Sequence, residues 1–142
     1  MTSNLLNSLE LGQRLNKPLV LSSRQLSWNG ILVEQFQRSS TSSLEMELPA
    51  ISDHWLNLSM GQPAHLTQKH GDRVHESIVQ KGDTIFIPAG QQSYWYQHEE
   101  NTCCPLHICL KPDLIDQVAE ASELNTGRFD LVNCFGQQDL QI

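Results

Sequence analysis

The stretch that decides the fold is Gly82-Asp-Thr-Ile-Phe-Ile-Pro88-Ala-Gly90-Gln-Gln-Ser93. Gly82 and the Pro88-Ala-Gly90 corner are turn signals, because proline fixes φ and glycine reaches positive φ without steric cost. Residues 84–87 between them are β-branched or aromatic, which predicts a short strand. The corner redirects the chain, so we predict that Ser93 begins a second strand with its side chain pointing into a barrel.

Short strand patterns recur on both sides of this stretch. Each is an alternating or β-branched run bounded by turn residues, and the turns include Lys69-His-Gly-Asp72. The predicted strands cover residues 31–36, 44–48, 56–60, 64–68, 73–79, 84–87, 93–97 and 106–110. About eight short strands at close spacing are typical of a β-sandwich or barrel. The sequence therefore predicts a mainly β domain.

The pattern changes after Lys111. Pro112 suits a first helical turn, and apolar residues then recur at helical spacing at Leu114, Ile115, Val118 and Ala119. We expect a barrel over about residues 18–110, an amphipathic helix over about residues 112–124 and a tail over residues 125–142. All three parts are expected to form one domain, residues 1–142, because the chain has the length of a single ordinary domain.

The bulk composition is that of a folded chain. Its 142 residues include 39% hydrophobic and 18% charged side chains, which excludes a disordered protein. The net charge of −7 has the wrong sign for neutralising phosphates, so this chain alone is not expected to bind nucleic acid. No apolar run reaches the roughly 20 residues that span a bilayer, and the N-terminus lacks a secretory pattern. We therefore expect a cytoplasmic protein without membrane contact.

The cysteines are clustered near one end of the chain, at Cys103, Cys104, Cys109 and Cys134. They are too few and too close together for a disulfide scaffold, so we expect free thiols. A zinc site that adds His107 to three of them is not expected, because Cys103 and His107 would lie about 13 Å apart along one strand.

The quoted stretch resembles the second conserved box of the cupin superfamily: a glycine, five residues, a proline, one residue, a glycine, two residues and a histidine. Every position matches except the last, where Ser93 stands in place of the histidine. Upstream, residues 54–61 resemble the glutamate-to-glycine half of the first box, with His54 in the glutamate position. The resemblance implies a cupin-like, jelly-roll β-barrel.

Cupin enzymes hold iron, manganese or another divalent ion through two histidines and a glutamate of the first box and the histidine of the second. Counted back from His54, the two histidine positions fall on Glu47 and Pro49 or on Leu48 and Ala50. Neither register supplies a histidine, so we predict no metal ligands and no cofactor. The alternative is a metal-dependent cupin enzyme, a dioxygenase or isomerase, that uses Glu47, His54 and a third ligand.

Further motifs resemble the N-terminal sensor domain of AraC-type transcriptional regulators. They are the opening Trp28-Asn-Gly, the Gly-Asp-x4-Pro-Ala-Gly box, the strand-to-helix junction of residues 106–113 and the closing Phe135-Gly-Gln-Gln-Asp139. The resemblance implies a non-catalytic domain that senses an unknown small-molecule effector and dimerises. It also implies that DNA is bound only through helix-turn-helix units that this chain does not contain, which agrees with its acidic charge.

Strand alternation predicts the ligand-binding residues. It places Trp95 and Gln97 on the same face as Ser93, and we place His54, Leu56 and Leu58 on the lining of a neighbouring strand. The predicted ligand site therefore consists of His54, Leu56, Leu58, Ser93, Trp95 and Gln97. Two alternatives stay open here. One is a barrel filled by its own side chains, in which Trp95 packs and His54 makes a structural hydrogen bond, and the other is a purely dimerising module.

The predicted helix has an apolar face that either packs across a symmetric partner or covers a barrel edge. We expect a homodimer, because apolar residues recur along this face and the AraC-type resemblance implies dimerisation. The predicted dimerisation residues are Leu114, Ile115, Val118 and Leu124.

Overall fold

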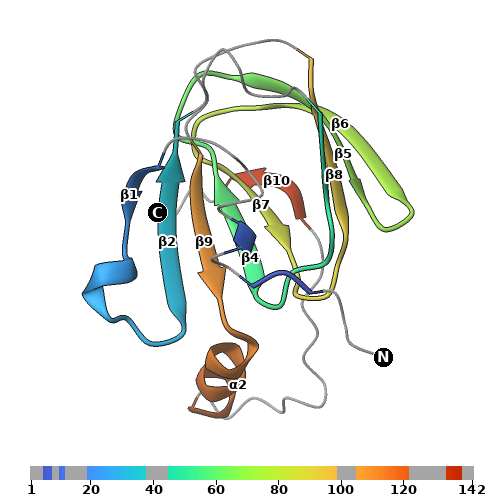
Figure 1. The fold of residues 1–142 in the computed structure, drawn as a ribbon. Helices are drawn as coiled ribbons and strands as arrows, with labels where there is room; N and C mark the ends of the chain where they lie inside the picture. The colour runs from blue at the N-terminus through green and yellow to red at the C-terminus, as the bar shows by residue number, and fades with distance from the viewer. Residues whose placement is uncertain are drawn as a thin grey trace.

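The fold consists of two facing β-sheets with a helix at one end (Figure 1). This computed structural model describes residues 5–7, 10–11, 19–37, 45–98, 105–121 and 134–138. Its elements are β1 (Leu19–Ser22), η1 (Arg24–Leu26), β2 (Ile31–Phe36), β3 (Glu45–Leu48), β4 (His54–Leu58), β5 (Ala64–His70), β6 (Arg73–Val79), β7 (Asp83–Ile87), β8 (Ser93–Gln97), β9 (Leu106–Leu110), α2 (Pro112–Ala121) and β10 (Cys134–Gln138). The predicted mainly β class, with a helix after the barrel, is confirmed.

The sheets interleave strands from distant parts of the chain. One sheet has the order β1-β2-β9-β4-β7-β10, and the other has the order β3-β8-β5-β6. All neighbouring strands in these orders pair antiparallel. Thus β9 lies between β2 and β4, and β8 lies between β3 and β5. Two packed sheets with such crossed connections form a jelly roll, as the cupin resemblance implied.

All the strands expected from the sequence are present, and two more extend the six-stranded sheet at its edges. β1 pairs with β2, and β10 pairs with β7. The second pairing means that the chain returns to the sheet after α2, beyond the expected end of the barrel near residue 110. Leu124, expected in the helix, lies outside the described residues.

The apolar core lies between the two sheets. Trp55 on β4 is 2% exposed, and its backbone partners Ile87 on β7 and Cys109 on β9 are also buried. From the facing sheet, Leu48 on β3 and Trp95 on β8 belong to the same hydrophobic cluster. These side chains hold the sheets together because their contact removes apolar surface from water.

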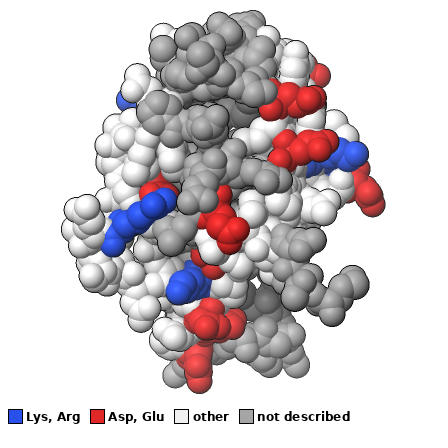
Figure 2. Space-filling model, in the orientation of Figure 1, with Lys and Arg blue, Asp and Glu red and all other residues white. Residues whose placement is uncertain are grey.

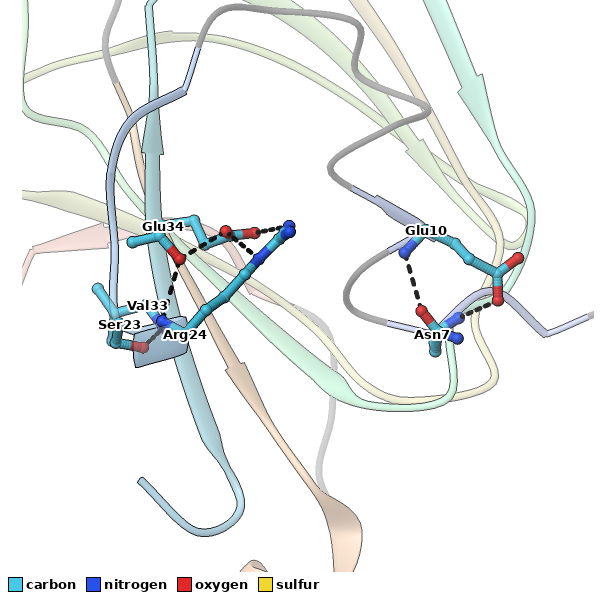
Figure 3. Close-up of polar contacts among 7 residues, drawn as sticks. Asn7, Glu10, Ser23, Arg24, Val33 and Glu34 are labelled. Atoms are coloured by element: carbon cyan, nitrogen blue, oxygen red, sulfur yellow. Dashed lines mark hydrogen bonds and ion pairs between the residues drawn. The ribbon is translucent and has the colours of Figure 1, made fainter. Parts of the chain in front are cut away.

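A buried carboxylate ties η1 to β2 (Figure 3). Glu34 is 3% exposed, and Arg24 donates from Nε to Oε2 at 2.8 Å and from Nη2 to Oε1 at 3.1 Å. The Ser22 hydroxyl donates to the same Oε2 at 2.8 Å. Nearby, Ser23 Oγ accepts the N–H of Val33 at 2.8 Å. The charge of Glu34 is therefore compensated within the fold.

Arg24→Ala is expected to lower the free energy of unfolding by about 2 kcal/mol, because Glu34 loses two charge-assisted hydrogen bonds while staying buried. The loss stays below that for a fully buried pair, since the Arg24 side chain is 42% exposed and water screens part of the attraction. Urea unfolding followed by circular dichroism measures the change. Adding Glu34→Gln to Arg24→Ala should recover part of the loss; an Arg24→Ala variant as stable as the wild type would contradict the expectation.

Helix α2 is fixed to the sheet through the turn that precedes β2. The Lys111 N–H donates to the Gly30 carbonyl at 2.9 Å. Gly30 has a φ of +84°, and a Cβ there would lie 3.3 Å from the Cβ of Leu114, so this position favours glycine. In the described part of the chain, no helix is long and apolar enough to cross a membrane.

Among the described residues on the face that Figure 2 shows, acidic and basic side chains are interspersed.

Candidate functional site

The interior positions that correspond to the cupin metal ligands carry other side chains here. On β3, Met46 pairs with Trp95 of β8, and Leu48 pairs with Ser93. Leu48 and Trp95 are buried, so these four side chains lie on the inner face of the sheet. Ser93, in the second-box histidine position, accepts the Nε1–H of Trp95 at 2.9 Å. Thioether, aliphatic and hydroxyl groups are poor ligands for a divalent iron or manganese ion. These positions therefore do not supply the ligands that hold the metal of cupin enzymes.

Metal ligands gather elsewhere on the molecule. Among the described residues, His65, Glu76 and His98 form the only group of three His, Cys, Asp or Glu side chains whose ligand atoms lie within 4.8 Å of one another. That group does not include Glu47 and His54, the two residues of the alternative metal-dependent prediction.

An aromatic cluster with a buried histidine lies between the sheets. The Trp55 Nε1–H donates to Nδ1 of His107 at 2.9 Å, and their rings stack at a centroid distance of 5.3 Å. Trp95 from the opposite sheet lies 5.2 Å from Trp55, and the edge of Phe36 meets His107 at 5.4 Å. Because Nδ1 of His107 accepts a hydrogen bond, the neutral ring carries its proton on Nε2. This is the arrangement expected for a barrel packed by its own side chains.

His70 is a second titratable group inside the barrel. It is 1% exposed at the end of β5, opposite Ser93 on β8, and its ring lies 5.8 Å from that of Trp95. Burial is the main cause that lowers its pKa to about 4, and the positive charges of Arg73 and His75 act in the same direction. His70 is therefore neutral at physiological pH.

The six predicted ligand residues divide between two faces. Ser93, Trp95 and Gln97 on β8 are buried, with 7%, 8% and 7% exposure. His54, Leu56 and Leu58 are only half-buried, and they alternate with Trp55, the residue of β4 that enters the core. The structure therefore does not place the two groups together, and the predicted inward orientation of the β4 residues is wrong.

His54 has a structural role on the outer side of β4. Its Nδ1 accepts the N–H of Ala89 at 2.9 Å, and its ring lies 5.9 Å from that of Phe86. Burial lowers the pKa of His54, while the carboxylates of Asp53 and Asp116 oppose that shift. The hydrogen bond fixes the Pro88-Ala-Gly90 corner against β4.

The predicted dimerisation residues have unequal environments. Leu114 faces the Gly30 turn and is half-buried, as is Ile115. Val118 is 55% exposed, whereas the adjacent Ala119 is 2% exposed. Leu124 lies outside the described residues. Within one chain, Leu114 and Ala119 of α2 are thus packed against the domain, whereas Val118 is exposed to water.

An open cavity of about 700 Å³ lies where β3 and β5 end and β8 begins. Its polar side chains come from three strands and from the loop before β8: Glu47, Lys69, Gln91, Gln92, Ser93 and Tyr94. Glu47 and Lys69 are both backbone partners of Tyr94, so the three side chains stand side by side on the outer face of the sheet. Of these residues, the sequence had indicated Ser93 as a ligand-binding residue and Glu47 as a metal ligand of the alternative enzyme. Gln91 and Gln92 beside the Gly90 turn were the available signal.

The same cavity contains a tyrosine that stays protonated. The Tyr94 hydroxyl donates to Oε2 of Glu45 at 2.5 Å, and this hydrogen bond is the main cause that raises the pKa of Tyr94 to about 12. The phenol is therefore a hydrogen-bonding group and not an anion at neutral pH.

Comparison with solved structures shows the fold. Oxalate decarboxylase from Bacillus subtilis matches with a TM-score of 0.50 at 12% identity, over 84% of this chain and 36% of that chain. Oxalate decarboxylase from Lactobacillus farciminis matches with the same TM-score at 14% identity, over 75% of this chain and 36% of that one. A Photorhabdus luminescens protein, plu4264, matches at 18% identity with a TM-score of 0.47, over 72% of this chain and 83% of that chain. No protein-family model and no curated protein matches the sequence.

The chain therefore has a cupin-like fold and spans 36% of the length of the oxalate decarboxylases it matches. This comparison corrects one prediction. The prediction that the chain is not an enzyme is contradicted by this comparison, because the oxalate decarboxylases that share its fold are enzymes and the fold therefore gives no ground for excluding catalysis.

Proposed function

We propose that this domain binds a small polar molecule in the cavity between the ends of β3 and β5 and the start of β8. The observation that supports the proposal is the convergence of Glu47, Lys69 and Tyr94 from three neighbouring strands on one cavity of about 700 Å³. Ligand sites are commonly clefts of this size, and the mouths of β-barrels are among their usual places.

The polar groups of the cavity select a chemical class. Among the described residues of the lining, Lys69 supplies the only cationic side chain, and Gln91 and Gln92 supply amide donors and acceptors. A small carboxylate has the charge for Lys69 and the acceptor oxygens for the amides of Gln91 and Gln92. Glu47 disfavours a second negative charge on its own side of the cavity. We therefore propose a small carboxylate that also carries hydrogen-bond donors.

The finer proposal is that binding has a regulatory role, as in the AraC-type sensor domains that the sequence motifs resemble. A ligand with different affinities for two states of the domain shifts their populations. In this proposal α2 mediates a homodimer, which the exposure of Val118 supports, and DNA contacts are made by a part of the protein outside this sequence.

The second candidate function is enzymatic, and the observation that favours it is the fold shared with the oxalate decarboxylases. Such an enzyme would act on the carboxylate held by the same cavity. Lys69 and the amides of Gln91 and Gln92 would then donate hydrogen bonds to the reacting molecule.

Thermal unfolding in the presence of a panel of small carboxylates, oxalate among them, tests the proposal. A ligand present at a hundred times its Kd stabilises the folded state by about 2.7 kcal/mol, which raises the Tm by several degrees. Lys69→Met should abolish the increase. Lys81→Met is the matched control, because Lys81 is an exposed lysine in the turn between β6 and β7.

The fate of the bound carboxylate then distinguishes the two candidate functions. Consumption of the bound carboxylate, followed by NMR, would favour the enzyme, and binding without consumption would favour the sensor. If no carboxylate shifts the Tm, or if Lys69→Met responds like the wild type, this cavity is not the binding site.

A further inference from the structure

Two histidines and a glutamate meet on the outer face of the four-stranded sheet, at the end opposite the cavity. His65 lies on β5, Glu76 on β6, and His98 follows directly after β8. The order β8-β5-β6 makes these strands neighbours. The His98 N–H donates to the His65 carbonyl at 2.9 Å, which sets the two histidines side by side. Glu76 pairs with Thr67, two residues along β5 from His65, so its side chain reaches His65 diagonally.

The side chains converge on one point. His65 Nε2 lies 2.6 Å from Oε1 of Glu76, and His98 Nε2 lies 4.0 Å from the same oxygen. The two imidazole rings are parallel within 14°, with centroids 4.0 Å apart. Both rings therefore present their Nε2 atoms toward one carboxylate. The edge of Tyr96 meets His98 at 4.7 Å and restricts the orientation of that ring.

We propose that His65, Glu76 and His98 bind a divalent transition-metal ion of the zinc class. Zinc is held by imidazole nitrogens at about 2.0–2.1 Å and by carboxylate oxygens at similar distances, so ligand atoms around a tetrahedral ion lie about 3.3 Å apart. The present separations of 2.6 Å and 4.0 Å fall on either side of that value. Small side-chain rotations, without movement of the sheet, bring the ligands into position.

Three protein ligands leave one position of a tetrahedral ion for water, which is the coordination of an open site. The side chains of His65, Glu76 and His98 are 36%, 58% and 31% exposed, so an ion has a path to them. Thr67 Oγ1 now lies 2.7 Å from His98 Nε2, and the ion replaces this contact. The alternative is that these residues bind no metal and form only two surface hydrogen bonds, one between His65 and Glu76 and one between Thr67 and His98.

The site is independent of the proposed carboxylate cavity. His65 and Lys69 are four residues apart on β5, about 13 Å at the usual rise per residue. His98 and Tyr94 are likewise four residues apart along β8 and its extension. Variants of one site therefore leave the other unchanged, and a failure of one proposal is distinguishable from a failure of the other.

Titration of metal-free protein with ZnCl₂ by calorimetry tests the proposal, after alkylation of accessible thiols to remove cysteine binding. We expect one ion per chain and a rise in Tm of about 5–10 °C at saturating zinc. His98→Ala should weaken binding at least about 100-fold, and Glu76→Gln about 10-fold. The absorption spectrum of the Co²⁺-loaded protein should show four-coordinate geometry in the wild type and lose it in His98→Ala.

His75→Ala is the matched control. His75 is exposed on β6 next to Glu76, but alternation sends its side chain to the opposite face, so the variant should bind zinc like the wild type. Circular dichroism verifies that each variant is folded, and Glu76→Gln serves as the second test if His98→Ala is not. Absence of zinc binding by the wild type, or equal binding by Glu76→Gln, would overturn the proposal in favour of the two surface hydrogen bonds.

Discussion

Replacing Trp55 by alanine is expected to lower the free energy of unfolding by about 4 kcal/mol. The side chain is 2% exposed and touches both sheets, since its ring lies 5.2 Å from Trp95 and 5.3 Å from His107. Its removal opens a cavity that a close-packed interior cannot fully collapse. It also deprives His107 Nδ1 of its hydrogen-bond donor. Urea unfolding followed by circular dichroism measures the loss.

Two variants separate the parts of this effect. Trp55→Phe keeps most of the ring but loses the N–H donor, so a decrease of about 1–3 kcal/mol is expected. Trp28→Ala is the matched control, because Trp28 is 53% exposed and its removal should change stability by less than about 0.5 kcal/mol. Equal losses for Trp28→Ala and Trp55→Ala would show that the core is not organised around Trp55.

The strands were predictable from local sequence because turn residues bracket them. Gly71 and Gly82 both adopt positive φ, at 62° and 92°, where the sequence predicted turns. Their flanking runs become β5, β6 and β7 within a few residues of the expected bounds. The addition of β10 to β7 was not predictable in the same way, because it depends on a sheet edge that only the assembled fold supplies.

The facing of β4 was predicted wrongly for a physical reason. This strand reads His-Trp-Leu-Asn-Leu, so large apolar side chains occur on both of its faces, and alternation alone does not identify the inner one. We chose the inner face of β4 by aligning His54 with a cupin glutamate, and this alignment predicted that the His54 side chain points into the barrel. In the structure Trp55 takes that position, since a tryptophan buries more apolar surface than the histidine beside it.

Neither candidate site was accessible to motif reasoning. Glu47, Lys69 and Tyr94 meet only through the registers of β3 with β8 and of β5 with β8. His65 and His98 are likewise brought together by strand pairing across 33 positions of the sequence. A one-residue change in either register would separate these groups onto different faces.

Stability is expected to fall as the pH is lowered from 6.5 to 4, because His70 is neutral in the folded state. Burial lowers its pKa to about 4, whereas the unfolded chain has the ordinary value of 6.5. Above pH 6.5 both states are neutral at this group, and its contribution is fully present. Between pH 6.5 and 4 the unfolded state binds the proton and the folded state does not, so protonation favours unfolding. The decrease over this window approaches about 3 kcal/mol.

The variant His70→Gln isolates this contribution, because glutamine does not titrate. We expect the free energy of unfolding of the variant to depend less steeply on pH between 6.5 and 4, whatever its absolute stability. His54 also has a lowered pKa and keeps part of the slope in both proteins. His75→Gln should reduce the slope slightly, because the positive charge of His75 contributes to the lowered pKa of His70. Urea unfolding at a series of pH values measures the difference, and parallel curves for the wild type and His70→Gln would show that folding does not lower the pKa of His70.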